Sequence, residues 1–215
     1  MRSDYEHWML PEVAAEHDDL NRTYFEKGEA GKYPYFYMLE RALKTVVDGS
    51  DGRRLSCLDV GCGAAWHAVY LSGLDIGANI AYEGLDISPH MCDRAKRNYP
   101  SGQFHVADIL EFNPGRQWDL VMACGSIEHL SNWQDMLARM ADLSSEWLVV
   151  HKVFFNNGAG LPTQHHPTYA GKTQLRMVVD YAEFCNVIKP FGHTVVQRYD
   201  WDTSVSCIVA RRKHA

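Results

Sequence analysis

The sequence predicts an α/β fold built on a doubly wound, mostly parallel sheet, and two observations support this. Between residues 55 and 155, hydrophobic strand-like runs alternate with helix-like segments five times. Such alternation is typical of a parallel sheet covered by helices on both faces. The strand-like runs at 193–199 and 204–210 have no helix between them, so we expect a C-terminal hairpin that adds one antiparallel strand to the sheet.

Length and composition favour a single domain. The chain has 215 residues, of which 46% are hydrophobic and 12% aromatic, and this is enough for one α/β core. We expect one domain over residues 1–215. It would comprise a helical and aromatic N-terminal cap at 1–50, a ligand-binding core at 55–155, and a final part at 156–215 with a lid loop, a helix and the closing hairpin.

Charge, hydropathy and cysteine usage argue against several classes of protein. The net charge of −6 disfavours a broad nucleic-acid interface. No apolar run approaches the roughly 20 residues of a membrane span, and the first residues are polar, unlike a secretory signal. The six cysteines contain no Cys-x-x-Cys pair, so we interpret them as reduced thiols of a cytoplasmic protein. The oligomeric state is not indicated.

The elements of the core follow from apolar runs and stop signals. Strands are expected at residues 55–60, 80–86, 104–106, 118–124 and 147–155. The first intervening helix covers 64–73, the second is capped by Ser88 and ended by Pro100, and the third is capped by Ser131.

Two further helices are expected outside this core. Hydrophobic residues recur at helical spacing from Leu39 to Val47, with a glycine after them to end the helix. Asp180, followed by Glu183, has the pattern of a capping box. Residues 1–33, in contrast, are polar and aromatic without one clear period.

Acidic and small residues stand where four of the predicted strands end. The first strand runs into the segment Leu58-Asp59-Val60-Gly61-Cys62-Gly63-Ala64-Ala65, whose glycines predict a tight turn into a helix. Asp86, Asp108 and the pair Cys124-Gly125 follow the next three strands. Ligands of doubly wound sheets bind beyond the carboxyl ends of the strands. An exposed glycine backbone with nearby carboxylates suits a ligand that carries an amino acid and a nucleoside.

These motifs resemble those of class I S-adenosylmethionine-dependent methyltransferases, which have a Rossmann-like sheet. The first-strand segment is similar to the first motif of that family. Leu85-Asp86-Ile87-Ser88 and Ala107-Asp108-Ile109 resemble the next two strand ends, and Trp118-Asp119-Leu120-Val121 with Ile127-Glu128-His129-Leu130 resembles the fourth strand and its exit. The resemblance covers residues 55–155, and the hairpin extends it to about residue 211.

The resemblance implies S-adenosylmethionine as cofactor and gives each strand end a role. The 61–63 turn would approach the methionine part, Asp59 would organise that turn and the ammonium group, and the backbone of Cys124 and Gly125 would line the same end. Asp86 would accept hydrogen bonds from both ribose hydroxyls. The adenine would contact Ile87, Met91, Asp108 and Ile109.

One departure from the family pattern bears on a rival interpretation. Ala65 and Trp66 stand where a third glycine is common. A dinucleotide-binding turn has the pattern Gly-x-Gly-x-x-Gly, and the indole of Trp66 would crowd a pyrophosphate there. An NAD-dependent dehydrogenase remains one alternative, and a module that binds the cofactor or a nucleoside without turnover is another.

Methyl transfer to a hydroxyl or an amine is helped by a nearby base. His129 is the first candidate, because an imidazole has a suitable pKa, and Glu128 is the second. Packing or capping is an equally good interpretation of His129. His151 and the His165-His166 pair are further candidates for a base, but we expect no metal site from that dipeptide.

The acceptor is expected to be a small molecule. The fourth strand is followed by Cys124-Gly125-Ser126-Ile127 and not by the Asn/Asp-Pro-Pro-Tyr/Phe loop that resembles base-amine methylation in nucleic acids. The part from residue 154 to residue 199 loosely resembles methyltransferases associated with surface polysaccharides. We therefore expect methylation of oxygen or nitrogen on a metabolite or glycan precursor.

Overall fold

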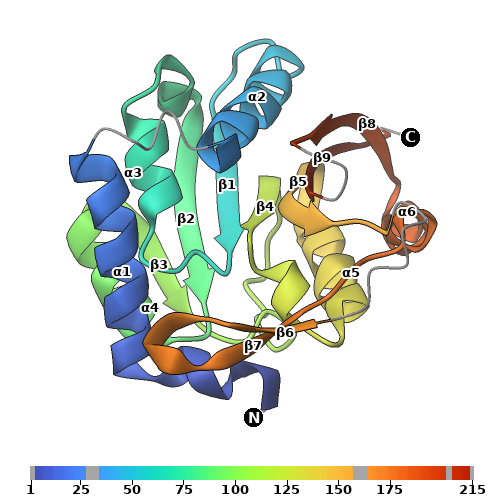
Figure 1. Ribbon diagram of the computed structural model, residues 1–215. Helices are drawn as coiled ribbons and strands as arrows, with labels where there is room; N and C mark the ends of the chain where they lie inside the picture. Colours follow the sequence, from blue (N-terminus) through green and yellow to red (C-terminus); the bar gives the residue numbers. More distant parts are fainter. Residues whose placement is uncertain (1–2, 28–33, 157–163, 202–204, 214–215) are drawn as a thin grey trace.

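A computed structural model describes residues 3–27, 34–156, 164–201 and 205–213. Its main feature is a seven-stranded sheet with the strand order β3-β2-β1-β4-β5-β9-β8 (Figure 1). The strands are β1 (Leu55–Val60), β2 (Ile80–Asp86), β3 (Gln103–Val106), β4 (Trp118–Cys124), β5 (Ser144–Phe154), β8 (His193–Asp200) and β9 (Val205–Arg212). The pairs among β1 to β5 are parallel, and β9 is antiparallel to both of its neighbours. The predicted fold class is confirmed.

Helices cover both faces of this sheet. The α-helices are α1 (Pro11–Glu26), α2 (Pro34–Asp48), α3 (Trp66–Ser72), α4 (Pro89–Asn98), α5 (Trp133–Leu143) and α6 (Tyr181–Ile188). Short 3-10 helices are η1 (Ser3–Met9), η3 (Asp75–Asn79), η4 (Ile127–His129), η5 (Tyr169–Gly171) and η6 (Lys189–Phe191). Helices α5 and α6 pack on one face, and α2 and α3 pack on the other. Among the described residues, no helix is long and apolar enough to cross a membrane.

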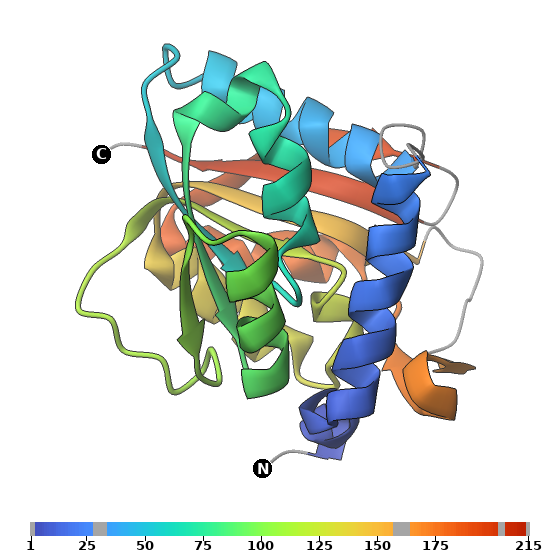
Figure 2. The ribbon, with the colours of Figure 1, turned by 90° about the vertical axis from the view of Figure 1, so that its left-hand side faces the viewer.

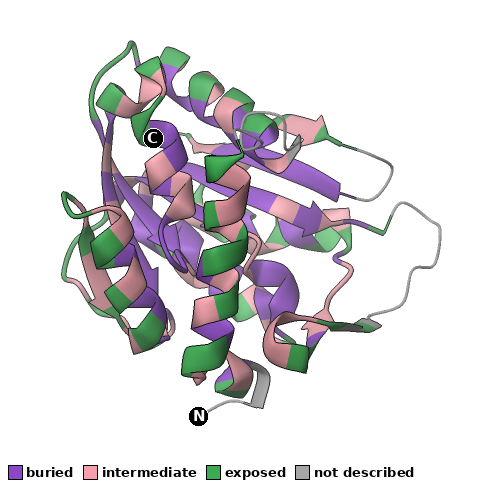
Figure 3. Ribbon diagram, turned by 60° about the vertical axis from the view of Figure 1, so that its left-hand side comes forward, coloured by how far each residue is buried: buried purple, intermediate pink, exposed green. Residues whose placement is uncertain are grey.

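Burial follows the alternation of side chains along the strands. Leu58 and Val60 of β1 join the α5 and α6 side of the core, whereas Leu55 and Cys57 join the α2 and α3 side, as expected when successive residues point to opposite faces. Figure 3 shows the central strands buried and the outer faces of the helices exposed. The sheet is therefore closed on both faces, and ligands reach it at an edge.

The strand boundaries agree closely with the sequence, but two helix starts do not. Ser131 is not the cap of α5: the cap position is Asn132, because its carbonyl accepts the first helical bonds, from the amides of Asp135 and Met136. Helix α3 begins two residues later than expected, since Ala65 adopts a left-handed conformation with φ of 61°. The predicted cap Ser88 does accept a hydrogen bond from the amide of Met91, at 3.4 Å.

Two elements were not predicted from the sequence. Helix α1 lies in the segment that showed no clear period, and it stands alongside α3 and α4 (Figure 2). The segment interpreted as a lid loop contains a hairpin of β6 (Gln164–Pro167) and β7 (Thr173–Arg176). The turn of this hairpin, η5, packs against α1. Both elements lie at the edge where the parallel strands end (Figure 1).

Candidate active site

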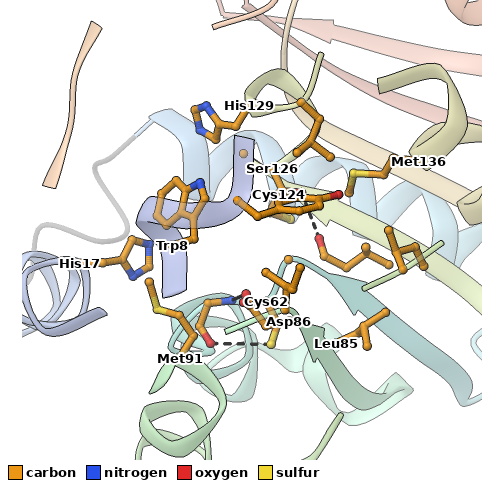
Figure 4. Close-up of a pocket in the computed structure, with 18 of the residues that line it drawn as sticks. Trp8, His17, Cys62, Leu85, Asp86, Met91, Cys124, Ser126, His129 and Met136 are labelled. Carbon is orange, nitrogen blue, oxygen red and sulfur yellow. Dashed lines mark hydrogen bonds between the residues drawn. The ribbon is translucent and has the colours of Figure 1, made fainter. Parts of the chain in front are cut away.

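The carboxyl ends of β1, β2 and β4 and the segment after β3 meet at one cavity (Figure 4). The cavity encloses about 910 Å³, part of it open to solvent. Its lining residues are Tyr5, Trp8, His17, Asn21, Val60, Gly61, Cys62, Gly63, Trp66, His67, Leu85, Asp86, Ile87, Met91, Ala107, Asp108, Ile109, Cys124, Gly125, Ser126, His129, Leu130 and Met136. Among the predicted cofactor residues and the first two candidates for the base, all except Asp59 and Glu128 are in this lining.

The turn after β1 depends on its glycines. Gly61 has φ of 74°, and a Cβ atom there would lie 2.6 Å from the Cβ atom of Ser126. Ser126 in turn donates a hydrogen bond to the carbonyl of Val60, at 3.0 Å. At Gly63, with φ of 53°, an added Cβ atom would approach the ring of His17 to 3.1 Å. Only residues without a side chain let the turn run this close to the loop after β4 and to α1.

Asp86 is the carboxylate best placed for a nucleoside. It is buried, and its two oxygens accept hydrogen bonds from the amides of Gly63 (2.9 Å) and Ser88 (2.8 Å). Burial raises the pKa of Asp86, although these amide donors oppose the rise. A carboxylate has about four lone-pair sites, so two further donors, such as ribose hydroxyls, can still bind. The amides fix the direction in which the carboxylate faces the cavity.

Apolar side chains line the cavity that Asp86 faces, and they suit a flat base such as adenine. They are Ile87, Met91, Ile109 and Met136. Asp108 also lines the cavity, and its Oδ1 accepts a hydrogen bond from the amide of Leu110, at 2.9 Å.

Asp59 does not reach the cavity. It is fully buried, and its Oδ2 accepts a hydrogen bond from the hydroxyl of Tyr82, at 2.8 Å, while Oδ1 has no hydrogen-bond partner among the described residues. Burial raises the pKa of Asp59 to about 7, against the lowering effect of Tyr82. The reason is its position, since Asp59 shares a face of β1 with Cys57 and points toward α2 and α3. The 61–63 turn is held by Asp86 instead.

His129 lies in the wall of the cavity and Glu128 lies behind it. The Nδ1 atom of His129 is 2.9 Å from the carbonyl of Leu175. Because a carbonyl can only accept, Nδ1 carries the proton of the neutral ring and Nε2 is the basic atom. Nε2 lies 3.7 Å from Oε1 of Glu128. Glu128 is fully buried, and neither of its oxygens has a hydrogen-bond partner within the described part of the chain.

The N-terminal segment supplies a wall that was not predicted residue by residue. Tyr5, Trp8, His17 and Asn21 line the cavity, and in Figure 4 Trp8 and His17 lie on the side opposite Leu85 and Met136. The later part of the N-terminal cap, residues 24–50, contributes no lining residue among its described positions. Residues 28–33 lie outside the described part of the structure.

A buried carboxylate on α1 holds this wall in place. Asp18 accepts hydrogen bonds from Trp66 (2.9 Å), Arg94 (2.9 Å) and Asn98 (2.8 Å), and Arg22 pairs with it at 3.3 Å. Burial raises the pKa of Asp18, but Asn98, Arg94 and Trp66 outweigh it and leave the pKa below its usual value. Helix α1 is thus tied to α3 and α4.

The other histidine candidates differ in surroundings. His151 is 1% exposed and does not line the cavity, and in the part of the chain that the structure describes neither of its ring nitrogens has a hydrogen-bond partner. His165 is exposed on β6, and the side chain of His166 lies outside the described part of the structure. No group of three metal-ligating side chains is arranged for a metal within the described residues, and all six cysteines are free.

The fold and the site together define a class of enzyme. A glycine turn after β1, an acid at the end of β2 and an antiparallel β9 beside β5 are features of the class I methyltransferase fold. Residues 57–146 match the family model of a methyltransferase domain. This part of the chain is similar to methyltransferase domains, whose cofactor is S-adenosylmethionine.

Solved structures with the same fold have low sequence identity to the chain. A magnesium protoporphyrin IX methyltransferase from Synechocystis with bound S-adenosylmethionine is 14% identical, with a TM-score of 0.71 and 99% of each chain covered. An amino pentose methyltransferase from Micromonospora echinaspora is 16% identical (TM-score 0.67), with 88% of this chain and 96% of that chain covered. A sugar N-methyltransferase from a Streptoalloteichus species is 18% identical (TM-score 0.66, coverage 88% and 93%). No curated protein sequence matches the chain.

The site fits this cofactor better than a dinucleotide. A pyrophosphate would have to bind at the N-terminus of α3, where Ala65 is left-handed and the indole of Trp66 is fixed by its bond to Asp18. A sulfonium nucleoside needs instead the acceptors at the end of β2 and the open turn after β1, and both line the cavity.

Proposed function

We propose that the protein transfers the methyl group of S-adenosylmethionine to an oxygen or nitrogen atom of a small-molecule acceptor, with His129 as the base. The observation that carries this proposal is the meeting of three features in one cavity. These are the carboxylate of Asp86, the 61–63 glycine turn and the imidazole of His129. The nucleoside part and the amino acid part of the cofactor would therefore bind in the same cavity as the proton acceptor.

The proposed cofactor contacts follow from the lining. Asp86 would accept the ribose hydroxyls, Ile87 and Met91 would pack on the adenine, and Asp108 would accept from its amine. The backbone at Gly61 and Gly125 would border the methionine part. When bound, the cofactor supplies a methyl group already activated by a positively charged sulfur, so the protein mainly has to align the acceptor.

His129 would take the proton that a hydroxyl or amine loses. Its Nδ1–H is directed to the carbonyl of Leu175, so Nε2 receives the new proton. Glu128, whose Oε1 is 3.7 Å away, then stabilises the imidazolium. Because Glu128 lies in the interior, screening by water is weak and the attraction between the two charges is strong.

Aromatic rings from the N-terminal segment and from η5 form a cover, which we call the roof, beside His129. Trp8 lies 5.7 Å from His129 and 5.9 Å from Tyr169, and His17 lies 5.1 Å from Tyr169, measured between ring centroids. A roof of this kind excludes water and limits the acceptor to a small molecule. The solved relatives named above act, by their descriptions, on a porphyrin, an amino pentose and a sugar, which supports a small acceptor.

Two sequence observations concern the kind of acceptor and the location of the protein. The net charge of −6 favours an acceptor that is not a nucleic acid. The six free cysteines support a cytoplasmic location.

Calorimetry and product assays test the proposal. The protein should bind S-adenosylhomocysteine more tightly than NAD, and it should release S-adenosylhomocysteine when incubated with S-adenosylmethionine and a panel of hydroxylated and aminated metabolites. Tighter binding of NAD would favour the dehydrogenase. Tight cofactor binding without product from any acceptor in the panel would favour the module without turnover.

A further inference from the structure

Lys152 occupies an unusual backbone position at the end of β5. Its φ is 65°, a left-handed conformation that costs a residue with a side chain about 1–2 kcal/mol. The pairing of β5 with β9 shifts register between His151 and Val153, so Lys152 is the extra residue of a β-bulge. Bulges beside active sites redirect a side chain, and here the redirected side chain is a lysine.

The bulge places the side chain of Lys152 beside Gly125, one of the residues that line the cavity. A Cβ atom added to Gly125, which lines the cavity, would lie 3.2 Å from Cδ and 3.5 Å from Nζ of Lys152. Nζ also lies 5.2 Å from the centre of the Tyr35 ring. The side chain is 34% exposed, so its charge is not sealed in the core.

The ammonium group of Lys152 has unused hydrogen-bond donors. Its closest carboxylate oxygen in the described part of the chain is Oε1 of Glu128, at 3.9 Å, which is beyond hydrogen-bond distance. No N–H group of Lys152 donates a hydrogen bond to the described residues, although an ammonium group has three. A ligand with acceptor oxygens can therefore bind it directly.

The charge of Lys152 acts on three histidines, and two of them, His17 and His67, line the cavity as neutral donors. Burial is the main cause that lowers the pKa of His17 and of His67 to about 4, and the charge of Lys152 lowers both further. Burial, His67 and Lys152 together place the pKa of His151 well below its usual value. His151 is buried, and neither of its nitrogens has a hydrogen-bond partner among the described residues, which costs about 1–3 kcal/mol.

The position of Lys152 in the sheet separates it from the proposed nucleoside site. Neighbouring strands are about 4.8 Å apart, and β5 is the third strand from β2 in the sheet order. Lys152 therefore lies about 14 Å across the sheet from the end that holds Asp86, although it is a neighbour of Gly125, which we assign to the methionine part. It also lies beside the proposed base, since Glu128 Oε1 is the neighbour of both Lys152 Nζ and His129 Nε2.

We propose that Lys152 binds an anionic group of the methyl acceptor, a carboxylate or a phosphate, and so selects acidic acceptors. The inference rests on the proposed function, because it places the acceptor above β4 and β5. The acceptor is then a small molecule whose nucleophilic hydroxyl or amine faces His129 while its anionic group contacts Lys152.

The test uses the protein loaded with S-adenosylhomocysteine and two simple anions, inorganic phosphate and acetate. Each is titrated at constant ionic strength with chloride, and the amide signal of Gly125 is followed by NMR. The variants are Lys152→Met and Lys152→Gly, the second because glycine accepts a φ of 65° and so removes the charge without backbone strain. Lys44→Met removes an exposed lysine of α2 and is the matched control.

In the wild type and the control, we expect a saturable shift of the Gly125 signal. In both Lys152 variants the dissociation constant should rise at least tenfold, while Lys152→Arg should retain binding. The anion that binds more tightly indicates whether the acceptor carries a carboxylate or a phosphate. Absence of saturation in the wild type, or equal binding in the variants, would overturn the inference.

Two controls separate this inference from its alternatives. The affinities for S-adenosylhomocysteine and for 5′-methylthioadenosine, which lacks the amino acid, should both be unchanged in Lys152→Gly. A loss for S-adenosylhomocysteine alone would assign the anion to the cofactor carboxylate and overturn the inference. Failure of the wild type to bind S-adenosylhomocysteine would contradict the proposed function itself, whereas normal cofactor binding without anion binding would contradict only the role of Lys152.

Discussion

Replacement of Asp86 tests the proposed site most directly. In the Asp86→Ala variant the cavity loses the carboxylate that we assign to the ribose, and the amides of Gly63 and Ser88 lose their acceptors. The Asp86→Asn variant keeps the size and one acceptor oxygen but removes the charge. Comparison of the two variants separates the loss of the ribose contact from the loosening of the turn.

The expected loss of affinity follows from the number of hydrogen bonds. A hydrogen bond to a charged group is worth about 1.5–3 kcal/mol. Loss of at least one such bond in Asp86→Ala should weaken binding of S-adenosylhomocysteine by tenfold or more, which is about 1.4 kcal/mol. The two unpaired amides should also lower the free energy of unfolding by about 1–3 kcal/mol, so binding must be measured well below the unfolding temperature.

Calorimetry with three ligands identifies the contact. S-adenosylhomocysteine and 5′-methylthioadenosine contain the ribose, and both should lose affinity in proportion. Adenine lacks the ribose and should bind the variants as it binds the wild type. Asp93→Ala, which removes an exposed carboxylate of α4, is the control. Unchanged affinity for the two nucleosides, or an equal loss for adenine, would refute the assignment of Asp86.

Three further predictions concern the base, a buried acid and the turn. His129→Gln should lower kcat about 10²–10⁴-fold at unchanged affinity for S-adenosylhomocysteine, and an unchanged kcat in product assays would exclude His129 as the base. The folded-state pKa of Asp59 is raised to about 7, so the folded protein keeps this proton longer than the unfolded chain. Protonated Asp59 therefore stabilises the folded protein below about pH 4, and this stabilisation is lost as the pH rises through about 7, which lowers the free energy of unfolding by roughly 4 kcal/mol. The Asp59→Asn variant should not show this loss when the free energy of unfolding is measured by denaturant titration at each pH. Parallel pH profiles for the variant and the wild type would contradict the reasoning. Gly61→Ala should destabilise the protein and weaken cofactor binding more than Gly52→Ala does, because both glycines have positive φ but only Gly61 faces Ser126; equal effects in thermal unfolding would show that the clash is unimportant.

The sheet could be predicted from the sequence because its strands are marked locally. Each parallel strand is a short apolar run that stops at an acid, a glycine or a proline-containing segment, and burial on both faces makes that run continuous. For the same reason the strand ends Asp86 and Asp108 were found at the cavity. The family model also covers this part of the chain, at residues 57–146.

Asp59 shows that a position at the end of a strand does not by itself predict a residue of the cavity. Knowing that an acid stands at the end of a strand does not say which face its side chain takes. Alternation along β1 places Asp59 with Cys57, toward the helices, and it would have shown that this acid points away from the turn.

Helix α1 shows a different limit. Its buried residues are Val13, Ala14 and Asp18, so the buried stripe is short and contains an acid, and the apolar period that marks a helix is weak. The acid is stabilised by partners on α3 and α4, which no local pattern can reveal. The β6–β7 hairpin was missed for a related reason, since its strands have only four residues each.

The bonds of Asp18 also set an order of events during synthesis. Its partners Trp66, Arg94 and Asn98 stand 48, 76 and 80 positions further along the chain. Helix α1 is made before α3 and α4, so its carboxylate lacks its full set of partners until α4 has been made. The nascent chain therefore has to carry this helix incompletely docked while β1, α3 and β2 form, and the wall that α1 adds to the ligand cavity can be fixed only after α4 exists.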